Sequence, residues 1–77
     1  MTDAAALQTS ITSEITRVSA KRERWRERGL AAGTMGNLRP ALYIMDQAIH
    51  FGREARDNGA VGDMVRDLAN LRAVEND

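Results

Sequence analysis

Apolar residues recur every three or four positions through most of this chain, and no segment has the pattern of a β-strand. The periodicity and its interruptions predict three helices, at residues 3–28, 38–58 and 63–74. We therefore expect an all-α protein with a single small domain over residues 1–77. The first two helices should form a long antiparallel hairpin, and the short third helix should pack across it.

The first predicted helix is amphipathic and has clear end signals. Thr2 or Asp3 can cap its first amides, and Gly29 is the expected stop. Arg22 falls within the apolar stripe, where its stem can cover apolar surface while its guanidinium reaches water or a carboxylate; the alternative is an anion site at an interface. The stripe consists of Leu7, Ile11, Ile15, Val18 and Trp25.

Residues 29–37 contain three glycines and predict a flexible connection between the first two helices. Leu30 and Met35 are expected to tuck beneath it. No strand precedes this segment and it lacks a Gly-Lys-Ser/Thr sequence, which argues against a phosphate-binding loop.

The second predicted helix ends at Asn58-Gly59 and has an apolar arc of about half its circumference, so it should contact two neighbours. Small residues along the middle of the arc would let another helix approach closely. We expect a homodimer whose seam follows these residues, which are Ala41, Ala48, Gly52 and Ala55. The third helix should begin near Gly62 or Asp63, with Asp63 as its cap.

Composition supports the expectation of self-association. Of the residues behind the 43% hydrophobic fraction, twelve are alanines and only 21 are larger apolar side chains. Small chains with so few large apolar residues often depend on oligomerisation or covalent staples. Because the chain has no cysteine, disulfides and cysteine-based zinc sites are excluded.

The inventory of reactive side chains argues against catalysis. His50 is the single histidine and there is no cysteine, so we expect no catalytic residues, no metal site and no cofactor. Asp46 and His50 are spaced by one helical turn, which predicts a surface hydrogen bond between them. No run of about 20 apolar residues is present and the N-terminus lacks the pattern of a secretion signal, so we expect a cytoplasmic protein that does not bind a membrane.

A basic segment is the strongest local signal. Residues 17–28 hold six cations and two anions, although the whole chain has a net charge of zero. Trp25 lies between the cations and the apolar face, where it could stack or become buried in an interface. The segment could bind an acidic protein surface, follow a nucleic-acid backbone, or remain solvated and internally paired. Its aligned cations are Arg17, Lys21, Arg24 and Arg28.

A weaker pattern concerns DNA reading by the third helix. The spacing of the small and apolar residues from 55 to 68 fits a helix-turn-helix, in which Val65 and Leu68 would seat the reading helix. Asp63 and Asp67 lie on that helix, however, and would repel phosphates. This makes the third helix a weaker nucleic-acid candidate than the basic segment.

Two stretches, Ser19-Ala20-Lys21-Arg22-Glu23-Arg24-Trp25 and Asn37-Leu38-Arg39-Pro40-Ala41, resemble parts of small all-helical proteins encoded by tailed bacteriophages and prophages. The resemblance covers residues 15–55. It implies an accessory protein in a bacterial host that binds a host or phage protein, for example to blunt a defence system or a regulator.

Together these patterns predict a non-enzymatic protein-interaction module whose partner has an acidic surface. A small nucleic-acid-binding protein and a structural phage assembly component remain alternatives. The predicted partner-binding residues are Arg17, Lys21, Arg24, Trp25 and Arg28, extended by Tyr43 and His50.

Overall fold

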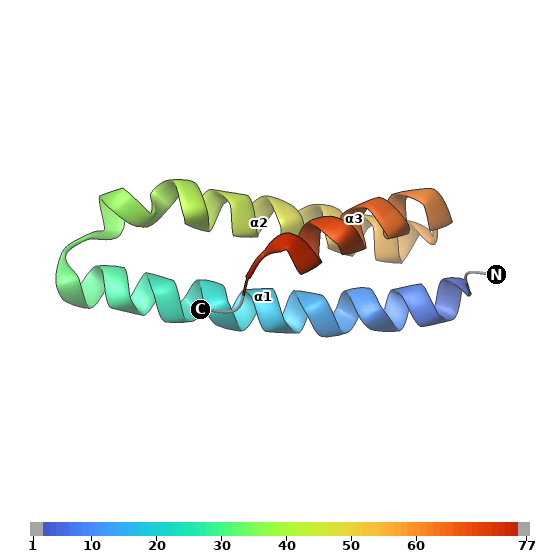
Figure 1. Cartoon of the computed structure of the whole chain (residues 1–77), viewed down its shortest axis with the longest axis horizontal. Helices are drawn as coiled ribbons and strands as arrows, with labels where there is room; N and C mark the ends of the chain where they lie inside the picture. The colour runs from blue at the N-terminus through green and yellow to red at the C-terminus, as the bar shows by residue number, and fades with distance from the viewer. Residues whose placement is uncertain (1–2, 76–77) are drawn as a thin grey trace.

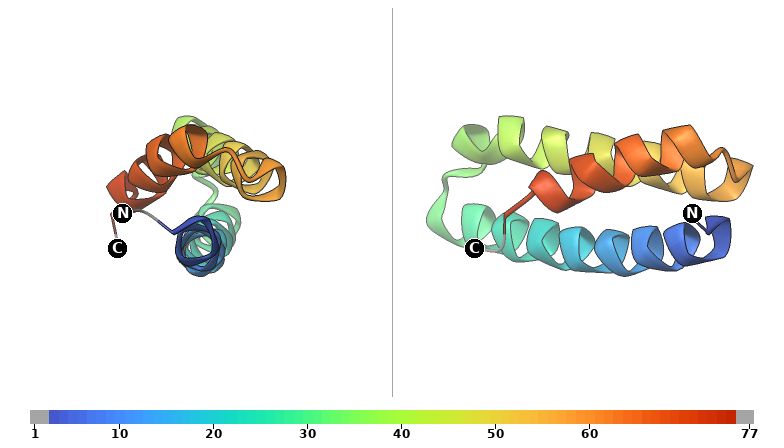
Figure 2. Two further views of the ribbon diagram at one scale, coloured as in Figure 1. Left: turned by 90° about the vertical axis from the view of Figure 1, so that its right-hand side faces the viewer. Right: turned by 45° about the vertical axis from the view of Figure 1, so that its right-hand side comes forward.

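A computed structural model describes residues 3–75 and shows three helices: α1 (Ala4–Ala32), α2 (Met35–Asn58) and α3 (Val61–Ala73). α1 and α2 form a long antiparallel hairpin, and α3 returns along the half of the hairpin that is remote from the α1–α2 turn (Figure 1 and Figure 2). The resulting rod measures 47 × 17 × 16 Å. The predicted all-α class is confirmed, and residues 3–75 contain no strand.

α1 begins as predicted but ends later. Its first turn is capped by Asp3, whose side chain accepts a hydrogen bond from the Ala5 amide at 3.0 Å; the alternative cap, Thr2, lies outside the described residues. The predicted stop at Gly29 is wrong, because the helix continues to Ala32 and ends at Gly33, whose φ is 69°. Gly33 takes the left-handed conformation that a helix stop requires.

Gly29 instead permits close packing at the α1–α2 turn. A β-carbon on Gly29 would lie 2.8 Å from Cδ1 of Leu38 and 3.3 Å from the Met35 Cα. Residues 29–37, which were predicted to form a flexible connection, are mostly helical. Only residues 33 and 34 lie between the two helices. Met35 packs against the core as expected, whereas Leu30 is 59% exposed rather than tucked beneath the turn.

α2 and α3 both begin earlier than predicted, at Met35 instead of residue 38 and at Val61 instead of residue 63. In α3, Ala60 occupies the N-cap position, and Asp63 lies within the first turn instead of capping it. A carboxylate there is favourable because it faces the positive end of the helix dipole. At the preceding turn, Gly59 ends α2 as predicted, with a φ of 67°.

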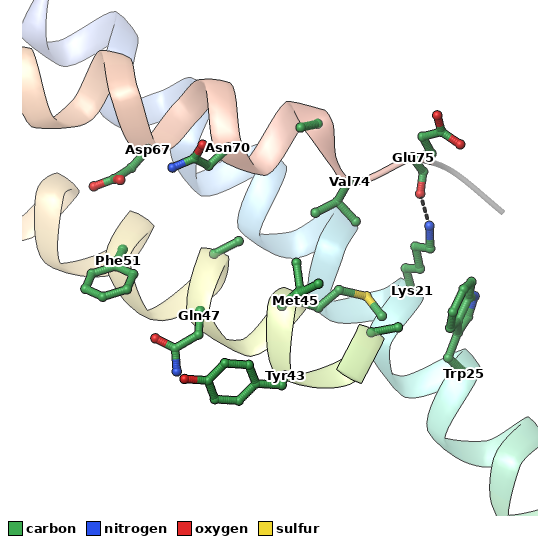
Figure 3. A pocket seen from close by; sticks show the side chains of 14 residues that line it. Lys21, Trp25, Tyr43, Met45, Gln47, Phe51, Asp67, Asn70, Val74 and Glu75 are labelled. Carbon is green, nitrogen blue, oxygen red and sulfur yellow. Dashed lines mark hydrogen bonds between the residues drawn. The ribbon is translucent and has the colours of Figure 1, made fainter. Parts of the chain in front are cut away.

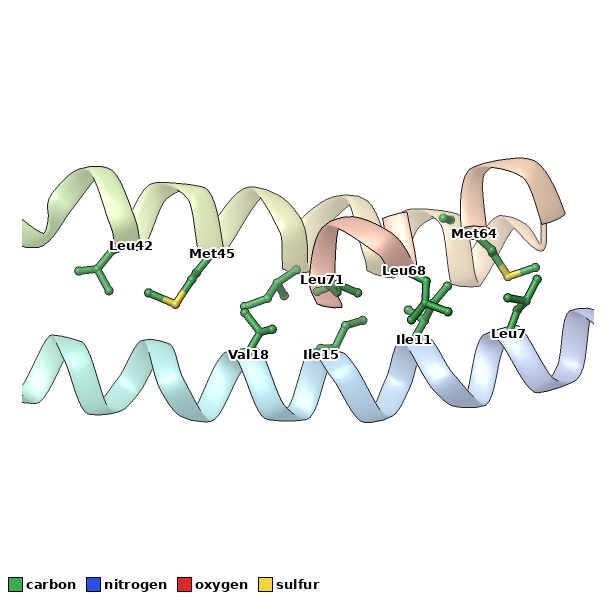
Figure 4. Packing of buried hydrophobic residues seen from close by; sticks show 11 residues of the cluster. Leu7, Ile11, Ile15, Val18, Leu42, Met45, Met64, Leu68 and Leu71 are labelled. Atoms are coloured by element: carbon green, nitrogen blue, oxygen red, sulfur yellow. The ribbon is translucent and has the colours of Figure 1, made fainter. Parts of the chain in front are cut away.

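All three helices contribute to one core (Figure 4). α2 has the two neighbours that its wide apolar arc predicted, but both of them, α1 and α3, belong to the same chain. Ile11, Val18, Met64 and Leu71 are completely enclosed. The buried hydrophobic residues are Leu7, Ile11, Ile15, Val18, Leu42, Met45, Ile49, Ala55, Met64, Leu68 and Leu71.

This packing corrects half of the predicted dimer seam. A β-carbon on Gly52 would lie 2.9 Å from Cδ1 of Leu71, and Ala55 is only 4% exposed. Both residues are therefore enclosed within the chain, and Gly52 lies against Leu71 of α3 and Ile11 and Ile15 of α1. Ala41 and Ala48 are half-buried and lie where α3 leaves α2 uncovered. No helix within residues 3–75 has both the length and the apolarity needed to cross a membrane.

Candidate functional site

An open groove of about 600 Å³ runs between α2 and α3. Met45, Ala41 and Ala48 line its α2 side, and Asn70 and Val74 line its α3 side. Figure 3 shows Phe51 and Tyr43 along the α2 side, with Asp67 and Asn70 across from them on α3. Lys21 and Trp25 of α1 lie at the end of the groove towards the α1–α2 turn.

The α2 side of the groove is an exposed apolar surface. Ile44 is 62% exposed and Phe51 is 46% exposed. Because Ala41, Ile44, Ala48 and Phe51 follow one another at spacings of three and four residues, they share one helix face. We call these four residues the α2 strip. Large apolar side chains grouped on one surface are typical of an interaction site.

Asp67 is a buried carboxylate in the α3 wall that the sequence did not identify as part of a site. It is 4% exposed, and its carboxylate accepts a hydrogen bond from Nε of Arg66 at 3.2 Å. That hydrogen bond is the main cause of a raised pKa for Arg66. Val65 is 49% exposed, so it does not seat α3 as the helix-turn-helix pattern requires. Leu68 is buried as that pattern requires, so the packing predicted for a helix-turn-helix is wrong at Val65.

Comparison of the chain with family models, curated proteins and solved structures finds no match.

Two of the predicted partner-binding cations hold the end of α3 against α1. Arg17 donates to the carbonyl oxygens of Val74 at 2.7 Å and Leu71 at 2.9 Å, and it pairs with Glu14 at 2.6 Å. Lys21 donates to the carbonyl oxygen of Glu75. Carbonyls at a helix C-terminus lack intrahelical partners and attract cations. Arg17 and Lys21 therefore follow the internally paired alternative for the basic segment, with carbonyl oxygens at the end of α3 among their partners.

Lys21 and Trp25 form a second internal contact. The Lys21 ammonium lies 5.0 Å from the centre of the Trp25 ring, within the range of a cation–π interaction. Lys21 is only 7% exposed, while Trp25 is half-buried and packs against the core. Trp25 is thus placed between core and groove, as its position between the two stripes predicted.

The remaining predicted cations, Arg24 and Arg28, lie exposed on α1. They belong to a chain whose charge is unevenly distributed along the rod. Residues 21–46, the half with the α1–α2 turn, carry six cations and three anions, a net charge of +3. Residues 3–20 and 47–75, the other half, carry five cations and seven anions, a net charge of −2. We call these the basic half and the acidic half.

Of the two residues predicted to extend this surface, Tyr43 lines the groove together with Lys21 and Trp25, whereas His50 is not among the residues that line it. His50 pairs with Glu54 at 3.4 Å, and its ring meets the Phe51 ring edge-on at 5.3 Å. The predicted partner of His50, Asp46, is instead bonded to Arg22 of α1. Residues 3–75 hold no cluster of three or more His, Cys, Asp or Glu suited to a metal ion.

Of the two interpretations of Arg22, the structure fits the one in which its guanidinium reaches a carboxylate. Its stem lies in the α1 stripe, and its guanidinium reaches the Asp46 carboxylate on α2. The hydrogen bond that Arg22 donates to the Asp46 carboxylate is the main reason that the pKa of Arg22 is raised. Glu23 is bonded to Arg22 at 3.0 Å and lies 3.9 Å from Arg26. This leaves Arg22 as a link between helices rather than an anion site.

Proposed function

We propose that this protein is a non-enzymatic interaction module that binds an acidic surface of another protein through Arg24 and Arg28, with Trp25 beside them. The observation that carries the proposal is the net positive charge of the basic half of the rod. Residues 21–46 contain six cations and only three anions. Arg24 and Arg28 are exposed there on α1. Charged groups of this kind steer a partner and fix its orientation, while a buried aromatic residue supplies much of the affinity.

The carboxylates and the apolar surface near these cations favour a protein partner over nucleic acid. Two of the four aligned cations, Arg17 and Lys21, are already engaged with α3. Two carboxylates, Glu23 and Glu27, lie in the same stretch of α1 and weaken a uniform attraction for phosphates. Apolar surface adjoins Trp25 along the groove. A mixed apolar and cationic surface fits a protein interface better than a phosphate backbone.

Nucleic-acid binding remains the second candidate because four arginines of the basic half are exposed. Counterion release would make such binding fall steeply with salt. A mobility-shift measurement with duplex and single-stranded DNA at two salt concentrations separates the two functions. Binding that is tight at low salt and collapses at moderate salt would replace the proposed function with this second one. The exposed arginines are Arg24, Arg26, Arg28 and Arg39.

The resemblance to phage and prophage proteins suggests where a partner should be sought. A host or phage protein of the bacterial cytoplasm, such as a defence factor or regulator, is the class proposed for the partner. A structural assembly component is the third candidate, and it would form higher oligomers. Light scattering would detect these directly.

The decisive experiment compares three immobilised forms of the chain in bacterial lysate. The first is the unchanged chain, the second carries Arg24→Glu and Arg28→Glu, and the third carries Arg53→Glu and Arg72→Glu as a matched control. Arg53 and Arg72 are also exposed but lie on α2 and α3. Both doubly substituted chains have the same net charge. We expect the unchanged chain and the control to retain an acidic protein and the Arg24/Arg28 variant to lose it, with unchanged circular dichroism. Equal retention by all three would refute the proposal.

A further inference from the structure

The α2 strip is a large apolar surface that the described chain does not cover. Ile44 and Phe51 extend from it at 62% and 46% exposure, and Ala41 and Ala48 lie between and beside them. The strip continues into the groove, whose opposite wall is formed by the C-terminal part of α3. On the same helix, Leu42, Met45 and Ile49 are buried in the core, and Met45 also lines the groove.

The order of side-chain sizes along the strip makes it complementary to itself. The sequence alternates a small residue, a large one, a small one and a large one at spacings of three, four and three. When two such helices lie antiparallel, Ile44 can face Ala48 of a second copy while Phe51 faces Ala41. By the same symmetry, Ala48 and Ala41 receive Ile44 and Phe51 of the second copy. Each large side chain then meets a small one, as close packing of two helices requires.

The charge distribution favours the same antiparallel arrangement. A parallel pair would place two basic halves, each with a net charge of +3, side by side. The antiparallel pair places the basic half of each rod next to the acidic half of the other, whose net charge is −2. Attraction between unlike halves over this distance is screened by salt, so it selects the orientation while the apolar strip supplies the contact.

We infer that the α2 strip binds the α2 strip of a second copy, and that the protein is an antiparallel homodimer through Ala41, Ile44, Ala48 and Phe51. This interface differs from the seam expected from the sequence, because Gly52 and Ala55 are enclosed within each chain. Trp25 lies at the end of the groove that the strip lines, but the two cations of the proposed function are not among the residues of that groove. Arg24 and Arg28 lie on α1, so a dimer joined through α2 keeps both sets of cations accessible.

Sedimentation equilibrium and light scattering test the inference on the unchanged chain. Over a concentration range of about 1 µM to 1 mM, we expect the mass to approach twice the 8.5 kDa of one chain. Raising the salt concentration should weaken the dimer. A mass of 8.5 kDa at every concentration would overturn the inference, and retention of a partner protein through Arg24 and Arg28 would be unaffected by that result.

Single lysine substitutions locate the interface. Ile44→Lys and Phe51→Lys each place a charge in the strip, and both should give monomers with unchanged helicity because the native side chains are exposed. Leu30→Lys is the matched control, since Leu30 is 59% exposed and lies on α1. The control should dimerise like the unchanged chain. Dimers of equal strength in all three variants would place the contact elsewhere and overturn the inference.

Distances between spin labels distinguish the antiparallel from the parallel orientation. Because the chain has no cysteine of its own, a single introduced cysteine carries the label at a known position. A label at Asn58→Cys should lie roughly 36 Å along the dimer axis from its copy in the antiparallel register, given a rise of 1.5 Å per residue. A label at Gln47→Cys should lie roughly 3 Å along that axis from its copy, near the centre of the interface. Short separations at both positions would indicate a parallel pair and contradict the inference.

Discussion

Gly52 of α2 and Leu71 of α3 are in such close contact that a β-carbon on Gly52 would lie 2.9 Å from Cδ1 of Leu71. Ile15 and Ile11 of α1 lie 3.6 and 3.7 Å from the same point. All three helices therefore meet at this glycine. Leu71 is completely enclosed, so a shift of its Cδ1 would have to displace neighbouring side chains of a close-packed core.

Gly52→Ala should consequently destabilise the fold. A helix interior gains up to about 1 kcal/mol when alanine replaces glycine. Overpacking of an enclosed core costs about 1 to 3 kcal/mol, so the clash with Leu71 should outweigh the gain. Thermal or urea unfolding measures the difference. Gly36→Ala is the control, because nothing lies within 4 Å of the added carbon, and it should leave stability equal or slightly higher. A stabilised Gly52→Ala variant would show that α3 can shift away from α2.

Arg17→Met should loosen the end of α3. The substitution removes two charge-assisted hydrogen bonds to the Val74 and Leu71 carbonyl oxygens. Because Arg17 is partly exposed, we expect a loss of about 1 to 2 kcal/mol. Hydrogen exchange of the amides in the last turn of α3 should accelerate more than exchange in α1. Arg72→Met, which changes an exposed cation on α3 itself, serves as the control. The internal role of Arg17 would be disproved by identical exchange in the two variants.

The Arg22–Asp46 ion pair should contribute little to stability. It joins α1 to α2, but the two side chains are 29% and 47% exposed. A double-mutant cycle with Arg22→Met and Asp46→Asn should give a coupling free energy of about 1 kcal/mol or less. The raised pKa of Arg22 means that its contribution is fully present below the unfolded-state pKa and is lost only as pH rises through the higher folded-state pKa. The coupling should therefore be constant from about pH 6 to pH 9. A coupling that falls within this interval would contradict the assignment.

The two glycines around the α2–α3 turn should respond oppositely to alanine. Gly59 has a φ of 67°, which an L side chain adopts with strain, so Gly59→Ala should destabilise the fold by about 1 kcal/mol. Gly62 lies in the first turn of α3 with open space around it, so Gly62→Ala should be neutral or stabilising by a few tenths of a kcal/mol. Chemical unfolding of both variants checks the pair. Equal effects would mean that the turn does not depend on the conformation of Gly59.

The sequence by itself determined the features that depend on neighbouring residues. Residues three and four apart on a helix share a face, so the stripe of Leu7, Ile11, Ile15 and Val18 could be recognised, and all four are buried. The Asp3 cap and the Gly59 stop were predicted for the same reason, because each depends on the conformation of only a few adjacent residues. The all-α class followed from these local patterns.

Tertiary structure decided the choices that local patterns left open. Gly29 and Gly33 could each have ended α1, and the packing of Leu38 and Met35 against Gly29 left Gly33 as the stop. Arg17 belonged to a cationic stripe in the sequence, yet it bonds to Val74, which lies 57 positions away along the chain. Periodicity showed that α2 needs two neighbours but not whether the second belongs to the same chain. Whether it does depends on where α3 packs against α2. That packing is a long-range contact, which the pattern of neighbouring residues in the sequence does not specify.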